Sequence, residues 1–371
     1  MTSRQRLLAA LDRKVPDRLP VTTHHLMPWF LEHQMGGISE REFFDRFDLD
    51  AILWTTPLRS ENVPDPNCTN CIQEIVPDPD YATTRYRIVT PRGTLSTILQ
   101  DDGRTRWVAE RLIQKKADVE IVAGIATEPL CDVDEVDRQA DAFGERGIVR
   151  GAVPGFPIYG QPGCWQDAAV LYGIEALILE TFSDPVWVEE LLTILQRRKL
   201  SFLHSARGAR FDLLELGGGD ASSSVISPAI FDRFVAPFDA PLVAAAHESG
   251  LRVVYHTCGG MMPLLERIAG MGPDAMETFT PRTMGGDVDL REAKRRIGHR
   301  VCMIGGFDQF HDFVGCSPEQ TRLAVRRLFE AAGQNGGYVL SPSDHFFEAD
   351  EALLHAFAEE AHACLYSVGP S

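Results

Sequence analysis

The chain has 371 residues, which is enough for one large α/β domain or for two domains of ordinary size. Hydrophobic residues make up 44% of the sequence and charged residues 24%, as in globular proteins with a packed core. The formal net charge of −17 argues against a basic surface for nucleic acid and against binding to an anionic membrane surface.

The first predicted element is an amphipathic helix at residues 1–12, with Thr2 or Ser3 as its N-terminal cap. Its pattern is not that of a signal peptide. No later stretch approaches the roughly 18 uninterrupted apolar residues of a membrane span. The eight cysteines are irregularly spaced and do not suggest a disulfide framework. We therefore expect a cytoplasmic protein with free thiols.

Eight short apolar or β-branched runs, each ending in polar or glycine-rich residues, are predicted to be strands. They lie at residues 19–23, 51–54, 147–153, 211–215, 251–255, 274–278, 300–304 and 337–341. Helical patterns separate most of them, at residues 185–207, 228–249, 262–270, 290–297, 318–332 and 349–367. Because strands that alternate with helices pair in parallel, eight such units predict a closed (β/α)8 TIM barrel.

An open, doubly wound sheet is the competing fold, but no strand is followed by a Gly-x-Gly-x-x-Gly fingerprint or a Walker-type loop. One segment interrupts the alternation. Residues 86–99 form two alternating patterns around Pro91-Arg92-Gly93, which predicts a β-hairpin inserted after the second strand, within about residues 80–115. The sequence shows no internal repeat and no low-complexity linker. We therefore expect a single domain over residues 1–371 with this insertion.

A His-x-Cys pair, His256 and Cys258, follows the predicted strand at residues 251–255. Residues i and i+2 of a strand lie on one face, so both side chains could point at a single ion. Imidazole and thiolate together suit Zn²⁺. The alternative is that both residues are buried without a ligand, since buried cysteine and histidine are common.

Barrel enzymes carry their sites at the carboxyl ends of the strands, and several of the predicted ends hold metal-capable or acid–base groups. These are His24, His25, Glu215, Asp220, His256, Cys258, Glu277, Asp308, Asp344 and His345. A zinc site needs three or four ligands. The third is expected to be Asp344 or His345, only one of which could normally reach the ion, and Glu215 is a possible fourth. Asp344 could instead cap a helix or bind substrate through a hydrogen bond.

Other residues at these ends are expected to bind cofactor or substrate. Gly217 and Gly218 would let the backbone approach a ligand, although a tight turn explains them equally well. Gly306 is a third candidate for cofactor binding. The residues expected to position substrate or move protons are Asp220, Glu277 and His24. The pair His24 and His25 could instead be hydrogen-bonded scaffolding.

Several motifs in this order resemble the uroporphyrinogen decarboxylase superfamily over nearly the whole chain. They are an early Arg-Gln-Arg-Leu-Leu-Ala-Ala-Leu followed by Pro-Asp-Arg-Leu-Pro-Val, Ile226-Ser-Pro-Ala-Ile-Phe231 with Pro237, His256-Thr-Cys-Gly259, Gly305-Gly-Phe-Asp-Gln309 and Gly336-Gly-Tyr-Val-Leu-Ser-Pro342. The likeness is closer to the methyltransferase branch, which includes methylcobamide:coenzyme M methyltransferases and corrinoid-dependent demethylases.

The resemblance implies a (β/α)8 barrel and, in the methyltransferase branch, zinc held by a His-x-Cys and a distant cysteine after the last strand. His256 and Cys258 match the first two ligands, but the third position falls near Asp344, so this chain departs from the pattern. The decarboxylase itself grips its substrate's carboxylates with early arginines. After Pro20 this chain has no arginine before Arg41, which argues against a tetracarboxylate substrate.

These observations favour a zinc-dependent methyltransferase that moves a methyl group between a small thiol or methyl ether and a corrinoid. The corrinoid would be carried by a separate protein, since no cobalamin-binding domain is recognised in the sequence. Two alternatives remain open. One is a metal-free decarboxylase or lyase with Asp344 and His24 as acid–base groups, and the other is a non-catalytic protein that binds a corrinoid or tetrapyrrole.

Overall fold

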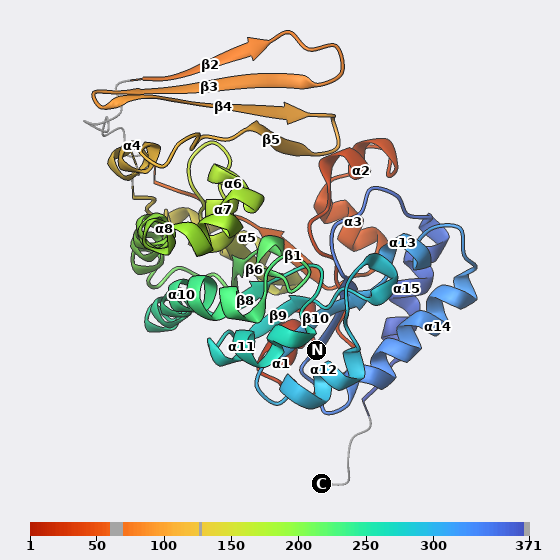
Figure 1. Cartoon of the computed structure of the whole chain (residues 1–371). Helices are drawn as coiled ribbons and strands as arrows, with labels where there is room; N and C mark the ends of the chain where they lie inside the picture. The colour runs from red at the N-terminus through yellow and green to blue at the C-terminus, as the bar shows by residue number, and fades with distance from the viewer. Residues whose placement is uncertain (60–69, 126–127, 367–371) are drawn as a thin grey trace.

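The computed structural model describes residues 1–59, 70–125 and 128–366, and its centre is a parallel sheet (Figure 1). The order of its seven strands is β1-β6-β7-β8-β9-β10-β11, and each neighbouring pair is parallel. The strands are β1 (Ala51–Trp54), β6 (Gly147–Ala152), β7 (Leu213–Gly217), β8 (Val253–His256), β9 (Ala275–Thr278), β10 (Cys302–Phe307) and β11 (Tyr338–Pro342). Seven of the eight predicted runs thus overlap strands of this sheet, with bounds that differ by up to three residues.

The remaining run, residues 19–23, lies between the two edge strands. Val21 forms a parallel bridge with Leu340 of β11, and the N–H of Thr22 donates to the carbonyl of Leu340 at 2.9 Å. On the other side, the N–H of Asp50, the residue before β1, donates to the carbonyl of Val21 at 2.7 Å. The sheet is therefore curled, with this segment hydrogen-bonded near both of its edges.

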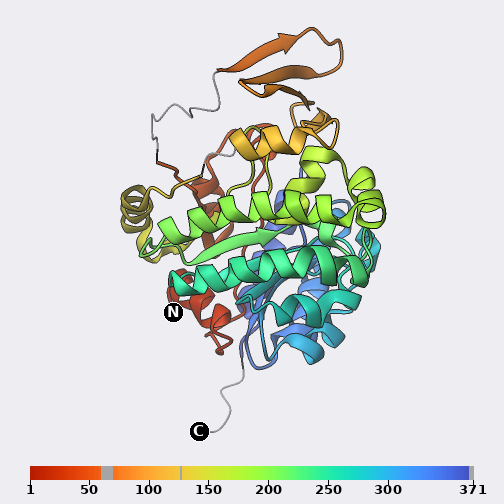
Figure 2. The same ribbon diagram turned by 60° about the vertical axis from the view of Figure 1, so that its left-hand side comes forward.

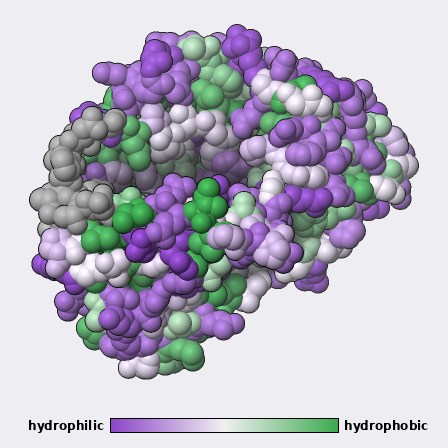
Figure 3. All heavy atoms as spheres, turned by 90° about the horizontal axis from the view of Figure 1, so that it is seen from above, coloured by the Kyte–Doolittle hydropathy of each residue, from purple (hydrophilic) through white to green (hydrophobic). Residues whose placement is uncertain are grey.

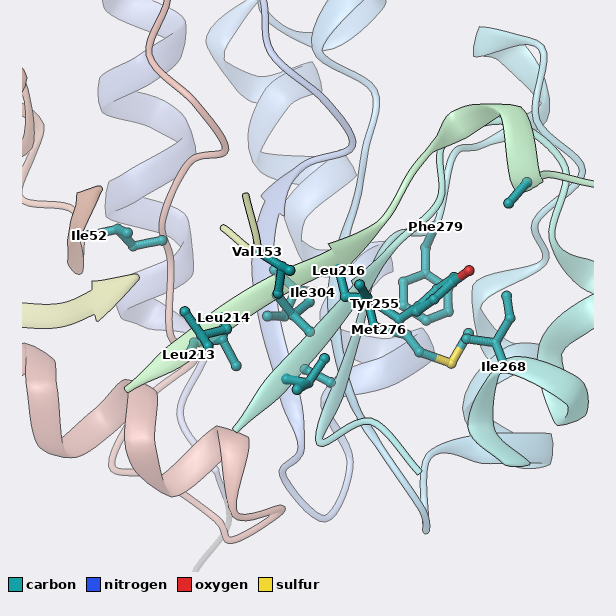
Figure 4. Close-up of a cluster of buried hydrophobic side chains, with 14 of the residues drawn as sticks. Ile52, Val153, Leu213, Leu214, Leu216, Tyr255, Ile268, Met276, Phe279 and Ile304 are labelled. Atoms are coloured by element: carbon teal, nitrogen blue, oxygen red, sulfur yellow. The ribbon is translucent and has the colours of Figure 1, made fainter. Parts of the chain in front are cut away.

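The strands are apolar because both faces of the sheet are covered, as is usual for parallel sheets. All five residues of β7 are buried. Figure 4 shows Tyr255 of β8 and Met276 of β9 within the core, with the side chain of Met276 extending toward Ile268 of α11 (Leu265–Gly270). This core fixes the strand positions, and through them the places where the polar strand ends meet.

Helices surround the sheet, and α8 and α10 lie side by side along it (Figure 2). The helices before residue 206 are α1 (Ser3–Leu11), α2 (Pro28–His33), α3 (Glu40–Phe47), α4 (Asp118–Ile125), α5 (Val133–Phe143), α6 (Cys164–Tyr172), α7 (Ile174–Ser183) and α8 (Pro185–Ser205). Besides α11, the later ones are α9 (Pro228–Ile230), α10 (Ala236–Glu248), α12 (Leu290–Ile297), α13 (Gln309–Asp312), α14 (Pro318–Leu328) and α15 (Glu351–Ala363). None of the described helices is both long and apolar enough to cross a bilayer.

A second sheet of four antiparallel strands lies over one side of the molecule (Figure 1). Its strands, in spatial order, are β2 (Asn70–Val76), β3 (Ala82–Thr90), β4 (Gly93–Asp101) and β5 (Arg106–Glu110). β3 and β4 pair on either side of the predicted turn, with Thr90 opposite Gly93. The segment is therefore larger than the hairpin we expected.

Contacts of the antiparallel sheet with the rest of the protein include apolar packing and a cation–π pair. Ile88 and Leu95 are buried in the main core. At the β4–β5 turn, the guanidinium of Arg104 lies 4.2 Å from the ring centroid of Trp29 in α2. Seen from above, the face that carries this sheet is hollowed (Figure 3).

Candidate metal centre

The His-x-Cys pair predicted to bind metal lies at the carboxyl end of β8. His256 is the last residue of that strand, Cys258 follows in the loop, and Asp344 comes just after β11. One ligand atom from each of the three residues lies within 4.8 Å of the other two, and each residue is partly exposed. We call these residues the His–Cys–Asp cluster. The cluster contains an imidazole, a thiol and a carboxylate, which together suit zinc. Because each residue is partly exposed, solvent can reach the cluster.

Glycines let the turn after β7 pack against this cluster. A Cβ atom on Gly219 would lie 2.6 Å from Cys258 Sγ, too close for a non-bonded contact. Gly217 has φ 99°, and its Cβ would lie 2.4 Å from the carbonyl oxygen of His256. A Cβ on Gly218 would meet a side chain of α6 at 2.5 Å. Gly217 and Gly218, predicted to approach a cofactor, are thus closely packed against the protein itself.

Glu277 of β9 stands behind His256. Its Oε1 lies 3.0 Å from His256 Nδ1, and its side chain is almost fully buried. Burial lowers the pKa of His256, but hydrogen bonds with Cys258 and Glu277 outweigh it and raise that pKa above its ordinary value. Because Nδ1 is engaged, Nε2 is the ring nitrogen available to a metal ion. A carboxylate in this position orients a metal-binding histidine and raises its basicity.

Arg150 of β6 is a buried cation, 1% exposed, that joins two carboxylates. Its Nη1 donates to Glu277 Oε2 at 2.9 Å. Its Nη2 donates to Glu215 Oε2 at 2.7 Å and also to Glu277 Oε1. Burial raises the pKa of Glu277, but the charge of Arg150 outweighs it and holds that pKa well below the usual range. Glu215, predicted as a possible fourth ligand, is therefore bound to an arginine.

His24 lies beside these carboxylates. Ligand atoms of His24, Glu215, His256 and Glu277 all lie within 4.8 Å of one another. His24 Nε2 is 3.4 Å from Glu277 Oε1, but the geometry gives neither ring nitrogen of His24 a hydrogen bond to any described residue. We call His24, Glu215 and Glu277 the buried carboxylate group. It adjoins the His–Cys–Asp cluster through His256.

His345 holds Asp344 in place. Its backbone N–H donates to Asp344 Oδ1 at 2.8 Å, and its ring Nδ1 lies 2.9 Å from the same oxygen. Burial raises the pKa of Asp344, but the hydrogen bond from His345 and the nearby imidazoles outweigh it and lower that pKa below its ordinary value. Asp344 lies in the cluster and His345 lies outside it. Of the two adjacent residues, only Asp344 lies with His256 and Cys258, and its role as a ligand stays a prediction.

Asp220 and Gly306 lie outside both groups. The carboxylate of Asp220 accepts a hydrogen bond from Gln166 Nε2 at 2.9 Å, its carbonyl accepts one from Trp165 Nε1 at 3.0 Å, and burial raises its pKa. A Cβ on Gly306 would lie 3.2 Å from Leu290 of α12, so Gly306 faces the helical layer. The structure does not bring these two predicted residues to the cluster.

Residues 147–364 match the family model of uroporphyrinogen decarboxylase (URO-D), and the match covers more than half of the chain. The chain belongs to the uroporphyrinogen decarboxylase family. Residues 147–364, which match the family model, contain strands β6 to β11 and most of the site residues. Those residues are Arg150, Glu215, His256, Cys258, Glu277 and Asp344. His24 and the antiparallel sheet lie before the matched part.

Uroporphyrinogen decarboxylases from several bacteria are similar in sequence to this chain. That of Neisseria meningitidis serogroup C is 32% identical over 127 residues, which is 33% of this chain and 33% of that protein. That of Shewanella loihica is 25% identical over 228 residues, 58% of this chain and 61% of that protein. The matches therefore cover less than two thirds of these relatives. A solved methyltransferase from Methanosarcina mazei has the same fold, with a TM-score of 0.64 and 15% identity over 97% of this chain and 98% of that one.

Two further residues, Arg150 and Gly219, contribute to the site and were not predicted from the sequence. Arg150 is a charged residue inside the apolar run at residues 147–153. Such an arginine in a strand buried on both faces requires buried counter-charges, so the signal was present. Gly219 is the last of three consecutive glycines, and only the structure shows that Cys258 lies against it.

Proposed function

We propose that this protein is a zinc-dependent methyltransferase that moves a methyl group between a small thiol or methyl ether and a corrinoid on a separate protein. The observation that carries the proposal is the His–Cys–Asp cluster, whose three partly exposed residues have ligand atoms within 4.8 Å of one another. The likeness in fold to a methyltransferase from Methanosarcina mazei supports it.

In this proposal His256, Cys258 and Asp344 hold the ion, and the fourth position is open to substrate. When bound, zinc supplies Lewis-acid chemistry that adjusts the reactivity of a substrate sulfur or oxygen. Glu277 keeps the imidazole of His256 turned toward the ion, and His345 keeps the carboxylate of Asp344 turned the same way. The ligand set carries one carboxylate where the methyltransferase branch implies a second thiolate.

We further propose that residues 1–371 form one domain built as a (β/α)8 barrel, with residues 19–23 in the eighth strand position. The hydrogen bonds of this segment near β1 and β11 support that proposal. The cytoplasmic location and the corrinoid-carrying partner expected from the sequence stay predictions.

Zinc analysis of purified protein tests the proposal, with Cys258→Ala as the variant. Cys316→Ala is the matched control, because Cys316 is a second partly exposed cysteine and lies outside the cluster. We expect one zinc per chain in the wild type and in Cys316→Ala, and its loss in Cys258→Ala. The same three proteins are then assayed for methylation of cob(I)alamin by candidate thioethers and methyl ethers.

The other functions suggested by the sequence correspond to different results of this experiment. Full activity in a metal-free wild-type protein, with release of carbon dioxide from a carboxylic acid, would support a decarboxylase or lyase, the activity named for the curated relatives. Tight corrinoid binding without turnover would support a binding protein. Either result refutes the zinc-dependent methyltransferase.

A further inference from the structure

The buried carboxylate group has the composition of a metal site but contains an arginine. Glu215 and Glu277 are 8% and 1% exposed, and both accept hydrogen bonds from the guanidinium of Arg150. His24 is 6% exposed, and its ring nitrogens have no hydrogen-bond partner among the described residues. Two carboxylates and an imidazole whose Nε2 lies 3.4 Å from one of them are thus gathered around one cation.

We propose that Arg150 occupies the place of a second metal ion and keeps the centre mononuclear. Ligand atoms of the three residues of the buried carboxylate group lie within 4.8 Å of one another, close enough to converge on one ion after small shifts. Zinc accepts this combination of nitrogen and carboxylate ligands. While the guanidinium is present, it takes up the carboxylate oxygens and supplies the positive charge that their burial requires.

Removal of this guanidinium changes the electrostatics in a way that favours a divalent ion. With Arg150 present, one positive charge faces two carboxylates. Without it, two carboxylates remain buried, and only the imidazoles of His256 and His24 lie beside Glu277, so the pair must take up a proton or bind a counter-ion. His24 then supplies a nitrogen ligand, because its ring makes no hydrogen bond with a described residue and only its 3.4 Å contact with Glu277 has to change.

The arginine also confines metal binding to the exposed cluster. Glu277 is then not a ligand of a second ion. Its Oε1 instead stays hydrogen-bonded to His256 Nδ1, at 3.0 Å. A metal ion in the buried position would compete for this carboxylate and release His256. The inference concerns residues next to the proposed zinc site, but its test does not require that site to be occupied.

The experiment measures zinc content in a background where the His–Cys–Asp cluster is disabled. Cys258→Ala is compared with the double variant Cys258→Ala/Arg150→Met after incubation with zinc and gel filtration. We expect no stoichiometric zinc in the first and one zinc per chain in the second. Adding Glu215→Gln to the double variant should remove that zinc, because it takes away a charged ligand.

Lys199→Met in the same background is the matched control. Lys199 is another buried cation, 1% exposed, that pairs with the buried carboxylate of Asp167 at 2.9 Å. Asp167 belongs to no metal-capable group among the described residues. We expect no gain of zinc in this variant. An equal gain in both variants would mean that any unpaired buried carboxylate collects zinc, and it would overturn the proposal.

A folding defect is itself informative here. If the Arg150→Met double variant melts early, zinc should raise its melting temperature more than that of Cys258→Ala, and EDTA should reverse the effect. The inference is overturned if the double variant folds but binds no more zinc than Cys258→Ala. It is also overturned if the variants with Arg150→Met and with Arg150→Gln both fail to fold in the presence of zinc. Absence of zinc from the wild type would refute the proposed function but leave this comparison intact.

Discussion

Substitution of Glu277 by glutamine tests whether the carboxylate behind His256 tunes the metal centre. The change keeps the size of the side chain but removes the charge 3.0 Å from His256 Nδ1. Loss of such a partner of a metal-binding histidine lowers metal affinity about 10- to 100-fold, or about 1.4–2.7 kcal/mol. We therefore expect zinc to dissociate from Glu277→Gln at a correspondingly lower chelator concentration than from the wild type.

The same substitution also weakens the buried ion pairs, so affinity must be separated from stability. Removal of one partner of a buried pair costs about 3–5 kcal/mol. Arg150 retains Glu215 at 2.7 Å, so we expect the lower half of that range, about 3 kcal/mol. Glu215→Gln is the matched control, because Glu215 binds the same arginine, whereas Nδ1 of His256 is hydrogen-bonded to Glu277 and not to Glu215.

Chelator competition gives the zinc affinity of both variants, and urea unfolding of the zinc-free proteins gives their stability. We expect similar losses of stability, with a loss of zinc affinity only in Glu277→Gln. Equal losses of affinity would refute the orienting role of Glu277 and would instead support Glu215 as a fourth ligand.

Three further predictions concern single positions. Gly219→Ala places a Cβ 2.6 Å from Cys258 Sγ and should lower zinc affinity about tenfold in chelator competition, whereas Gly270→Ala, with no atom within 4 Å of its Cβ, should not. Asp344→Cys supplies the second thiolate and should raise affinity for the soft ion Cd²⁺ at least about tenfold relative to Mn²⁺, measured by titration. Burial and the charges of His24 and Arg150 lower the pKa of His25 to about 2, from the ordinary 6.5. The unfolded chain thus binds one more proton between these pH values, so the free energy of unfolding rises as the pH is raised from about 2 to 6.5 and is lost as the pH falls. His25→Phe should reduce that slope in urea unfolding by up to about 1.4 kcal/mol per pH unit.

The parallel sheet was predictable because its strands are buried on both faces and therefore appear as continuous apolar runs. β1 (Ala51–Trp54) and α12 (Leu290–Ile297) lie at the predicted residues. The predicted helix at 228–249 is helical from Pro228 to Glu248, but it includes a π-helical turn at Phe231–Val235 that the sequence did not predict. The outer strands of the antiparallel sheet were not predicted, since pairing partners rather than local pattern decide whether an exposed segment becomes a strand.

For the site, the sequence spacing predicted that His256 and Cys258 lie together, although Cys258 is in the loop after β8 and not in the strand. The order of the strands brought Asp344 to the same end of the sheet. Their role as metal ligands stays a prediction. The partner of each carboxylate could not be predicted, because it depends on the register between β6, β7 and β9. Glu215 and Glu277 were expected to face a ligand, whereas Arg150 binds both.

The segment at Val21 that bonds to Leu340 has a consequence for how the protein is made. During synthesis from the N-terminus, the segment that carries His24 leaves the ribosome long before β11 and Asp344. A nascent chain that has reached Cys258 thus offers an ion only two of the three proposed ligands. Under the proposed function, full zinc affinity is acquired only after β11 docks beside residues 20–22, so zinc would stabilise the completed fold rather than guide its early steps.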